Sequence, residues 1–231
     1  SGSGIRTSAS VPAIVVVVTD GAHSPGQDPA NEAVLLRGLG AQIFAVGIGL
    51  QTSQLQPMAS SPASTFVRTI ADFSQLQGAI RDFTAKVCTA VSTALPPVAY
   101  VPPASTTQSV RCSRGADLVL VLDGSGSVSS SGWERIKTFA TRMVEGYSVG
   151  TAATQTQVAL VTFGYGATTR FNFKQHTSTT SVTNAIRQIR FPSGSATHTR
   201  SALSEVRQNL FELSGSGIRT SASVPAIVVV V

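Results

Sequence analysis

The residues best suited to chemistry lie in one short segment, Asp123-Gly124-Ser125-Gly126-Ser127. A carboxylate and two hydroxyls that alternate with glycine can all turn toward one point, because glycine lets the loop fold tightly. Hard oxygen ligands of this kind suit Mg²⁺, which takes few carboxylates and keeps positions for water. A serine- and glycine-rich turn before a helix cap would look similar, so the segment alone allows both interpretations.

Two further residues offer oxygen ligands at places where predicted elements end. Thr197 lies in a loop directly before an amphipathic helix that contains Ala202 and Leu203, and Asp20 follows the apolar run 14–18. In doubly wound sheets, ligands bind at the edge where the carboxyl ends of the strands meet. We therefore expect Thr197 and Asp20 to lie at the same edge as the Asp123 segment.

The apolar pattern predicts strands that alternate with helices. Strands are expected at 14–18, 42–48, 65–70, 117–122, 157–163, 167–173 (an edge strand) and 225–231. Helices are expected after Asp28-Pro29, after the cap Asp72, after a capping-box pattern at 131–134, and over 182–189 and 202–210. The predicted fold class is α/β, with a doubly wound, mostly parallel central sheet flanked by helices.

The two ends of the chain have the same sequence. Residues 1–18 read SGSGIRTSASVPAIVVVV, and residues 214–231 repeat them without a change, a period of 213 residues (214 − 1). Solenoid repeats run ~20–50 residues, so this period is that of a domain plus a linker. We expect the chain to be one phase of a tandem array of near-identical modules.

A linker is predicted at 89–111, where Pro96-Pro97 and Pro102-Pro103 stand among Ala, Val, Ser and Thr. Paired prolines favour the extended polyproline II conformation, which makes a semi-rigid spacer. On this division, residues 1–88 are the C-terminal half of one module and residues 112–231 are the N-terminal part of the next.

Both halves of the chain, apart from the linker, resemble the von Willebrand factor A domain, a Rossmann-like fold also found as the inserted domain of integrins. The metal-ion-dependent adhesion site (MIDAS) of that family is written Asp-x-Ser-x-Ser, then a Thr, then an Asp after the fourth strand. The matching residues are Asp123, Ser125, Ser127, Thr197 and Asp20. The resemblance implies a divalent cation, Mg²⁺ first with Mn²⁺ or Ca²⁺ as alternatives. In the family, the hydroxyls bind the ion directly, the Asp residues act largely through water, and one position is open to a partner's carboxylate.

One loop departs from the family pattern. The family often has Gly-Gly-x-Thr-x-Thr-Gly around the Thr, whereas this chain has the segment 194–200, which ends Thr199-Arg200. Loss of the last glycine is expected to stiffen the loop or to bring Arg200 to the rim of the metal site. His23 and His198 fall in loops beside the metal residues, and we interpret them as hydrogen-bonding rim residues and not as ligands.

The order of the motifs also departs from the family, because Asp20 precedes Asp123. A tandem array cut at this phase explains the order, and each complete module would then use the copy of Asp20 in the next repeat. The alternative is closure within one chain, in which Asp20 folds onto Asp123. That closure leaves two copies of the segment AIVVVV competing for one strand position, so we favour separate modules.

The two cysteines, Cys88 and Cys112, are too few for a disulfide scaffold and lack the spacing of a zinc site. In some relatives, cysteines at corresponding places clasp the two ends of one module. The resemblance therefore implies that Cys112 pairs with the next copy of Cys88, in an oxidising, extracellular setting. Two free thiols, or a direct bridge between Cys88 and Cys112, are the alternatives.

Composition excludes several classes of protein. The formal charge is +6, but the 17 basic residues are scattered and not arranged in the stripe expected of a nucleic-acid-binding surface. No apolar run approaches the ~20 residues of a membrane-spanning helix. The chain has neither a Gly-x-Ser-x-Gly elbow nor a cofactor fingerprint, so we expect no enzymatic activity.

The sequence thus predicts an extracellular adhesion or structural protein, with any export signal outside this chain. Its modules would assemble into fibres with other copies, or bind acidic protein or glycan ligands, through the metal site. Near-identical repeats multiply weak contacts by effective concentration, which suits either role. The alternative is an intracellular, metal-dependent interaction scaffold, against which the paired prolines and the cysteine positions speak.

Overall fold

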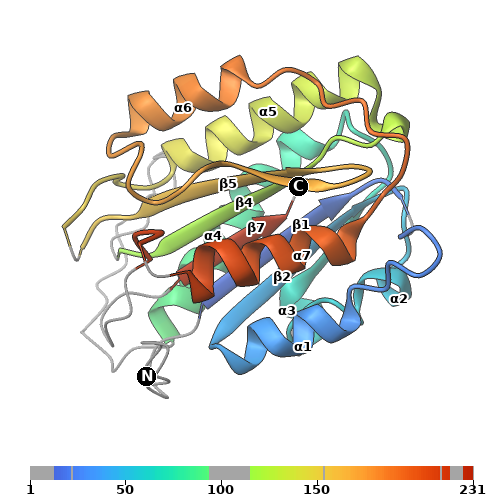
Figure 1. Ribbon diagram of the computed structural model, residues 1–231, viewed down its shortest axis with the longest axis horizontal. Helices are drawn as coiled ribbons and strands as arrows, with labels where there is room; N and C mark the ends of the chain where they lie inside the picture. Colours follow the sequence, from blue (N-terminus) through green and yellow to red (C-terminus); the bar gives the residue numbers. More distant parts are fainter. Residues whose placement is uncertain are drawn as a thin grey trace.

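The strands of the computed structural model lie in one sheet between two layers of helices (Figure 1). The structure describes residues 13–21, 23–93, 115–152, 154–213, 215–218 and 226–230, with no description of the side chains at 13–18, 90–93 and 226–230. Cys112, residues 94–111 of the predicted linker, residues 1–12 of the first repeated end and half of the second repeated end lie outside the described residues.

The sheet has seven strands in the order β3-β2-β1-β7-β4-β5-β6, and in addition β1 pairs with β4 and β2 pairs with β7. All neighbouring pairs are parallel except β5 with β6, which is antiparallel and places β6 at an edge. The bounds are β1 Ala13–Thr19, β2 Ala41–Ile48, β3 Val67–Ile70, β4 Asp117–Asp123, β5 Gln157–Phe163, β6 Ala167–Phe171 and β7 Ala226–Val230.

The helices form the two outer layers. α4 and α5, and α5 and α6, contact each other on one face of the sheet, whereas α1 and α7 contact each other on the opposite face (Figure 1). Their bounds are α1 Ala30–Gly38, α2 Thr52–Leu55, α3 Ala63–Phe66, α4 Leu76–Thr93, α5 Ser129–Glu145, α6 Thr179–Gln188 and α7 Thr199–Glu205. A 3₁₀ turn, Gly126–Val128, precedes α5, and a π-helical segment, Val206–Glu212, follows α7.

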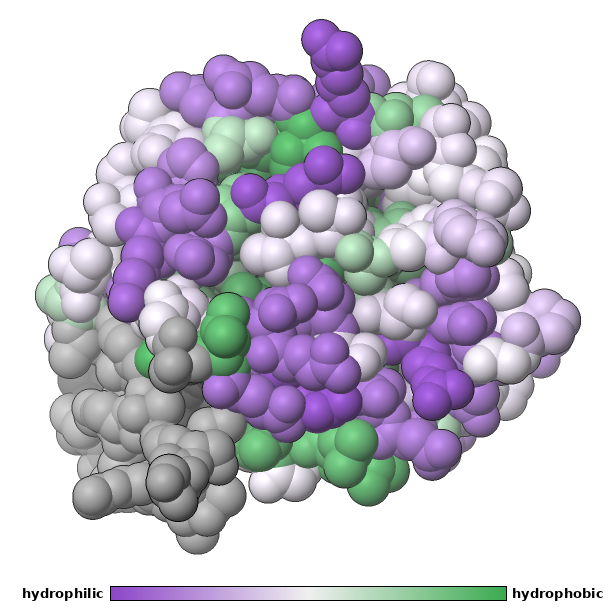
Figure 2. Space-filling model, viewed as in Figure 1, coloured by the Kyte–Doolittle hydropathy of each residue, from purple (hydrophilic) through white to green (hydrophobic). Residues whose placement is uncertain are grey.

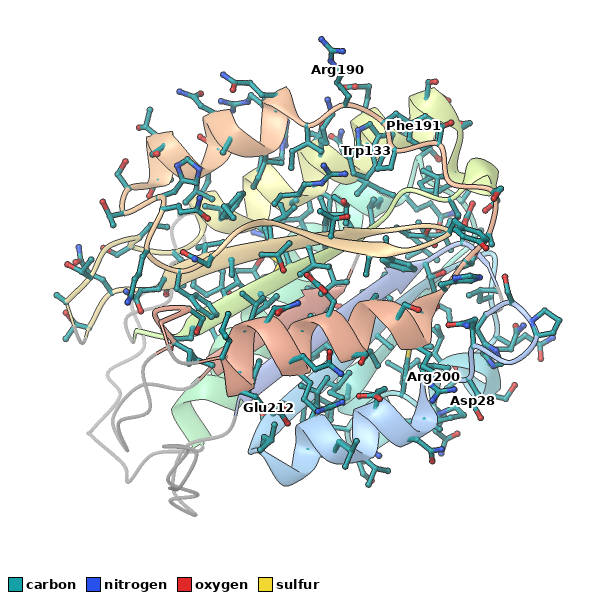
Figure 3. The ribbon with its side chains drawn as sticks, viewed as in Figure 1. Asp28, Trp133, Arg190, Phe191, Arg200 and Glu212 are labelled. Carbon is teal, nitrogen blue, oxygen red and sulfur yellow. The ribbon has the colours of Figure 1, made fainter. Side chains whose placement is uncertain are left out.

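The predicted fold class is confirmed, and the apolar runs explain why. Leu118 to Leu122 of β4 are fully buried, as expected of a parallel strand that is covered on both faces. The predicted apolar face of α5 is also buried, at Trp133, Ile136, Ala140, Met143 and Val144, and Tyr147, two residues beyond the end of the helix, is buried as well. The indole Nε1 of Trp133 donates to the carbonyl of Ile189 over 3.2 Å, and its ring lies against Phe191 (Figure 3).

Several predicted element boundaries were wrong, as three examples show. α5 begins at Ser129, because the preceding 3₁₀ turn runs into it, so the supposed capping serine Ser131 lies inside the helix. Residues 65–66 belong to α3 and not to a strand. Asp72 accepts hydrogen bonds from Ser74 in a turn, and α4 begins only at Leu76. Short-range hydrogen bonds set each of these boundaries, and the hydropathy pattern of the sequence does not reveal such bonds.

The two parts of the chain that flank the predicted linker close into one sheet. β1, β2 and β3 precede the linker, β4 to β7 follow it, and β1 pairs directly with β4. This arrangement corresponds to closure within one chain, with Asp20 folded onto Asp123, which was the less favoured of the two predictions from the sequence. α4 also continues to Thr93, so residues 89–93 of the predicted linker are helical.

The view in Figure 2 is mostly hydrophilic, with hydrophobic atoms at its lower edge, where Figure 1 places α1. Val34 and Leu35 of α1 are 57% and 50% exposed. Within the described ranges, no helix combines the length and the apolar character needed to cross a membrane.

The packing of α5 in the core can be tested at Phe139. This residue is buried, and its ring centroid lies 6.1 Å from that of Phe83 in α4. Phe139→Ala is expected to lower the free energy of unfolding by about 3–5 kcal/mol, because it leaves a cavity in the core. The neighbouring Thr138→Ala, at a half-buried position of the same helix, is the control and is expected to change the free energy of unfolding by less than about 1 kcal/mol. Urea unfolding measures both, and similar losses for the two variants would contradict the packing described.

Candidate metal centre

The register between β1 and β4 brings the two predicted carboxylates together. Val18 pairs with Leu122 in the parallel ladder, so the residues that follow each strand leave the sheet side by side. The hydroxyl of Thr19 donates to Asp123 Oδ2 over 2.9 Å. Asp20 comes next in the chain, and its Oδ1 accepts a hydrogen bond of 2.8 Å from the hydroxyl of Ser127.

The loop after β4 places two hydroxyls beside these carboxylates. The backbone N–H of Ser125 donates to Asp123 Oδ1 over 2.9 Å, which folds the loop back over the end of its own strand. The Ser125 and Ser127 hydroxyl oxygens are 3.1 Å apart. Asp123 and Ser125 are buried, whereas Ser127 is exposed, so the cluster opens to solvent on one side.

Two glycines allow the loop before α7 to lie directly on this loop. Gly194 exchanges backbone hydrogen bonds with Gly124 and Gly126, at 2.9 and 2.7 Å. A Cβ on Gly194 would lie 2.8 Å from the Gly164 Cα, and one on Gly124 would lie 2.5 Å from Pro192 Cγ. Contacts below 3 Å do not occur for real Cβ atoms, so both close approaches require glycine.

The same contact brings Thr197 to the cluster. The backbone N–H of Ser24 donates to the Thr197 carbonyl over 3.1 Å, and the Ser24 hydroxyl accepts from the Thr197 N–H over 3.2 Å. A Cβ on Gly21 would lie only 3.2 Å from Thr197 Oγ1, so the backbone after Asp20 passes directly beside this hydroxyl. In Figure 1 the blue loop after β1 meets the orange loop before α7 at the right-hand side.

Burial makes the two carboxylates costly to ionise. It raises the pKa of Asp123 from its ordinary value of 3.8 to about 6, against opposing hydrogen bonds from Ser125, and the charge of Asp20 raises it further. Burial also raises the pKa of Asp20, although the hydrogen bond from Ser127 opposes the change. Among the ion pairs of the described ranges, none joins a basic side chain to either carboxylate. The cluster is therefore a site of uncompensated negative charge.

The donor set fits a small, hard divalent cation. It has two carboxylates and three hydroxyls, all oxygen, and it opens to solvent, where water or a ligand could complete the coordination. The described residues contain no group of three or more His, Cys, Asp or Glu side chains that could hold a metal, so a site dominated by histidine or thiolate is not available there. A bound cation would supply the positive charge that the two carboxylates lack.

The structure thus joins four of the predicted site residues, Asp20, Asp123, Ser125 and Ser127, by hydrogen bonds, and it places the hydroxyl of the fifth, Thr197, beside the backbone of Gly21. Sequence reasoning missed Thr19, whose buried hydroxyl donates to Asp123, although its position at the end of a strand beside Asp20 was a signal. It also missed Tyr165, a 70% exposed side chain whose ring centroid lies 5.0 Å from that of His198.

The residues predicted at the rim of the metal site are His23, His198 and Arg200. His198 precedes α7 and packs against Tyr165, and the exposed His23 lies within 3.4 Å of the Ser24 carbonyl. Arg200 is exposed in the first turn of α7 and lies at the same end of the molecule as Asp28 (Figure 3). Cys88 of α4 is disulfide-bonded, while Cys112 lies outside the described residues, so the proposed pairing between repeat copies stays a prediction.

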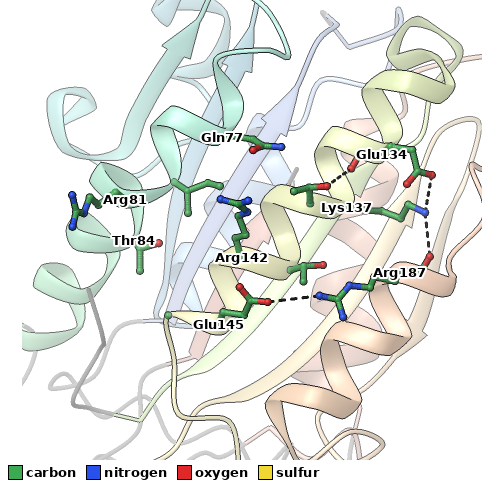
Figure 4. A pocket seen from close by; sticks show the side chains of 12 residues that line it. Gln77, Arg81, Thr84, Glu134, Lys137, Arg142, Glu145 and Arg187 are labelled. Atoms are coloured by element: carbon green, nitrogen blue, oxygen red, sulfur yellow. Dashed lines mark hydrogen bonds and ion pairs between the residues drawn. The ribbon is translucent and has the colours of Figure 1, made fainter. Parts of the chain in front are cut away.

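A separate groove of about 670 Å³ lies between α4, α5 and α6 (Figure 4). The charged side chains that line it are Arg81, Glu134, Lys137, Arg142, Glu145 and Arg187. Lys137 Nζ contacts Glu134 at 2.8 Å and the Arg187 carbonyl at 3.1 Å, and Arg187 pairs with Glu145 at 3.7 Å. The groove contains none of the five predicted metal residues, so we assign the candidate metal chemistry to the cluster at the sheet edge.

Comparison with known proteins agrees with this geometry. The sequence model of the von Willebrand factor type A domain family matches residues 1–82 and 117–231. The chain belongs to this family. The two matched segments leave out residues 83–116, which include the proline-rich stretch.

Relatives of this von Willebrand factor A domain include matrix and adhesion proteins. The mouse collagen alpha-4(VI) chain is 31% identical over 233 residues, which is all of this chain but 10% of that protein. Chicken integrin alpha-1 is 30% identical over 129 residues, 56% of this chain and 42% of the relative. This chain therefore spans about a tenth of the collagen relative and less than half of the integrin sequence.

Among solved structures, the match to an uncharacterised protein from Alicyclobacillus acidocaldarius covers 85% of this chain and 92% of that protein's chain. The TM-score is 0.58 and the sequence identity is 14%, so the likeness is one of fold alone. Proximal thread matrix protein 1 from the mussel byssus, described with a zinc-occupied MIDAS motif, covers 88% of this chain and 48% of its own, at 25% identity and a TM-score of 0.43.

The raised pKa of Asp123 predicts a pH dependence in the metal-free domain. A carboxyl with a pKa of 3.8 unfolded and about 6 folded binds more protons when folded, so stability falls as pH rises between these values. The full effect is about 3 kcal/mol, and the raised pKa of Asp20 acts in the same direction.

Asp123→Asn removes the titrating group and is expected to flatten this dependence. Urea unfolding in chelator between pH 4 and 7 measures it, with Asp28→Asn, an exposed change in the loop before α1, as the control. A metal-free wild type that became more stable from pH 4 to 7 would contradict the uncompensated charge.

Proposed function

We propose that this chain is a non-enzymatic, divalent-cation-dependent adhesion module of an extracellular matrix or adhesion protein. The observation that carries the proposal is the cluster of Asp20, Asp123, Ser125, Ser127 and Thr197. Its oxygen donors come from three separate loops, and its two carboxylates have no basic partner in the described part of the chain. A cation with free coordination positions at this edge suits binding of an acidic group and supplies no nucleophile or redox centre.

The metal that fits best is Mg²⁺. Asp123 and Asp20 are the only carboxylates in the cluster, and the other donors are the hydroxyls of Ser125, Ser127 and Thr197. Ca²⁺ sites use six to eight oxygen ligands in a flexible shell, whereas Mg²⁺ is held by one or two carboxylates and keeps several waters. The hydroxyls would contact the ion, the carboxylates would hold it directly or through water, and the exposed side at Ser127 would face the ligand.

The ligand proposed is a carboxylate or other acidic group of a partner. Two carboxylates neutralise a dication and leave coordination positions open, and an acidic group that fills such a position experiences little repulsion from a chain with a net charge of +6. Acidic side chains on other copies of the module, or acidic protein and glycan ligands, satisfy this chemistry. The exposed Tyr165 and His198, which follows Thr197 in the chain, add two aromatic rings whose centroids lie 5.0 Å apart.

We further propose that the chain is one phase of a tandem array, in which residues 1–88 and 112–231 belong to successive modules and the copy of Asp20 in the next repeat takes the place that Asp20 has in the cluster described here. The identity of residues 1–18 with 214–231 supports the array. The proline-rich segment 89–111 would be the spacer, and Cys112 would pair with the next copy of Cys88. A disulfide at Cys88 and relatives named as collagen VI and integrin chains favour an extracellular, oxidising setting over an intracellular scaffold.

Magnesium is expected to stabilise the folded chain by about 2.7 kcal/mol at 100 times its dissociation constant. Calorimetric titration with Mg²⁺, Mn²⁺ and Ca²⁺ gives the affinities, and thermal unfolding in each ion gives the stabilisation. Ser125→Ala combined with Ser127→Ala removes two donors and is expected to weaken binding by roughly tenfold or more.

Ser131→Ala is the matched control, because Ser131 is an exposed serine of α5 that bonds only with Ser129 among the described hydrogen bonds. It is expected to bind metal as the wild type does. Equal affinity in the double variant and the wild type would refute the assignment of the cluster as the metal site.

Self-recognition and acidic-ligand binding give different results in sedimentation. If copies recognise one another, the wild-type chain is expected to associate in Mg²⁺, to dissociate in chelator, and to stay monomeric as Asp123→Asn. If the partner is a separate acidic molecule, the chain stays monomeric in Mg²⁺ and retains an aspartate-rich peptide only in the presence of the ion. Neither association nor peptide binding in Mg²⁺ would contradict the proposed adhesion.

A further inference from the structure

The positive charge of the chain is unevenly distributed along its sequence. Residues 146–204 contain five basic residues and no aspartate or glutamate, whereas the other residues include 12 basic and 11 acidic ones. This acid-free stretch therefore carries five of the six net positive charges. It forms β5, β6, α6 and most of α7, so the excess charge lies toward the β6 edge of the sheet. Its basic residues are Arg170, Lys174, Arg187, Arg190 and Arg200.

The protein itself neutralises little of this charge. Among the ion pairs of the described residues, one involves the acid-free stretch, and in it Arg187 contacts Glu145 at 3.7 Å. Arg170 and Arg190 have no carboxylate partner in that set. Unpaired cations at one edge of a protein attract anionic ligands to that edge.

A groove of about 440 Å³ lies between β6 and α6 within this stretch. Arg170 of β6 and His176, which precedes α6, line it from one side. Ser181, Asn184 and Gln188 line it from α6, and their spacing of three and four residues places them on one face of the helix. No acidic side chain is among the residues that line the groove.

The two outer strands hold Arg170 at this groove. Its Nε donates to the hydroxyl of Thr162 in β5 over 2.7 Å, and no other hydrogen bond or ion pair of the described residues engages its guanidinium. The preceding Thr169 bonds instead to Glu205 of α7 at 2.7 Å, because neighbouring residues of a strand point to opposite faces. The carboxylate that β6 contacts therefore lies across the sheet from the groove, and the two Nη groups of Arg170 are left for a ligand.

The ring of His176 is also held in place. Its Nδ1 lies 2.7 Å from Ser181 Oγ, and its plane is perpendicular to that of Phe171, with 4.9 Å between the ring centroids. When Nδ1 accepts the hydrogen bond from the serine hydroxyl, Nε2 carries the ring hydrogen and is a donor. The groove thus combines a guanidinium, an imidazole, a hydroxyl and two side-chain amides.

We infer that this groove is the binding site of a sulfated glycan chain. A sulfate group presents tetrahedral oxygens, as phosphate does, and these accept paired hydrogen bonds from a guanidinium such as that of Arg170. The amides of Asn184 and Gln188 donate to and accept from the hydroxyls of a sugar. The site contains none of the five predicted metal residues and does not rest on the proposed function.

A second cation lies beyond the far end of the groove. Arg190 follows Ile189, which lines the groove, and its side chain points outward from the molecule (Figure 3). α6 has 10 residues and is about 15 Å long, so His176 before it and Arg190 after it lie too far apart for one small anion. A chain with sulfates repeated along its length reaches both. The neutral amides between the two ends match the sugar hydroxyls between sulfates, which a run of acidic residues in a peptide lacks.

Calorimetric titration of the 231-residue chain with heparin oligosaccharides, at about physiological ionic strength, tests the inference. Arg170→Gln is expected to weaken binding by roughly tenfold or more, the usual effect of losing hydrogen bonds to a charged group. Arg81→Gln, which makes the same change at an exposed arginine of α4, is the matched control and is expected to change the affinity by less than about twofold. Equal losses in the two variants would overturn the assignment to the groove.

A second pair of variants adds charge and spares the hydrogen bond between Arg170 and Thr162. Gln188→Glu places a carboxylate in the groove, and Gln77→Glu places one at an exposed position of α4. Both glutamines are exposed, so both variants are expected to unfold at the temperature of the wild type. Gln188→Glu is expected to weaken heparin binding by roughly tenfold, because its charge repels the sulfates at close range, and Gln77→Glu by less than about twofold. Unchanged binding in Gln188→Glu would overturn the site.

The choice of ligand class is tested with two other probes. Heparin from which the sulfates have been removed, and a polyglutamate peptide, are both expected to bind at least tenfold more weakly than heparin. Polyglutamate that binds as tightly as heparin would overturn the glycan and indicate an acidic peptide. Desulfated heparin that binds as tightly as heparin would overturn the role of the sulfates.

Chelator separates this inference from the proposed function. Heparin is expected to bind equally well in Mg²⁺ and in chelator, and equally well to the wild type and to Asp123→Asn. Binding that needs Mg²⁺ and is lost in Asp123→Asn would place the glycan at the metal site and overturn the groove. A chain that binds heparin in chelator but does not bind Mg²⁺ would refute the proposed metal site and leave the groove standing.

Discussion

The parallel pairing of β1 with β4 is the interaction on which the candidate site depends. It aligns Val18 with Leu122, so that Asp20 and Asp123 emerge from the sheet beside each other although 103 positions (123 − 20) separate them in the chain. The loops after β4 and before α7 then close over this point through backbone hydrogen bonds at Gly124, Gly126 and Gly194. A shift of one residue in that register would separate Thr19 from Asp123 and disperse the oxygen donors.

The folded chain places two carboxyl groups at this edge of the sheet, where burial makes their ionisation unfavourable. Burial raises the pKa of Asp123 to about 6 and the pKa of Asp20 in the same direction, yet no basic side chain in the described ranges pairs with them. Elsewhere the protein pairs its buried charge, as where Arg207 contacts Glu32 at 2.8 Å. The difference indicates a site that folding leaves incomplete, and a divalent cation is the simplest group that would complete it.

The sequence predicted more of the site than of the boundaries of the elements around it. Asp123, Ser125 and Ser127 could be identified because their spacing is local, and the runs that form β4 and β5 are continuous enough to mark buried strands. The start of α5 could not be predicted, because a 3₁₀ turn and not a serine cap leads into it. Thr19 was missed because its role depends on a hydrogen bond to a residue far along the chain.

By itself, the sequence determined the α/β alternation, the oxygen ligands and the identity of the two terminal segments, since each is a property of residue type and local spacing. Only the tertiary structure decided that Asp20 and Asp123 meet within one chain, because that meeting requires a strand register across the linker.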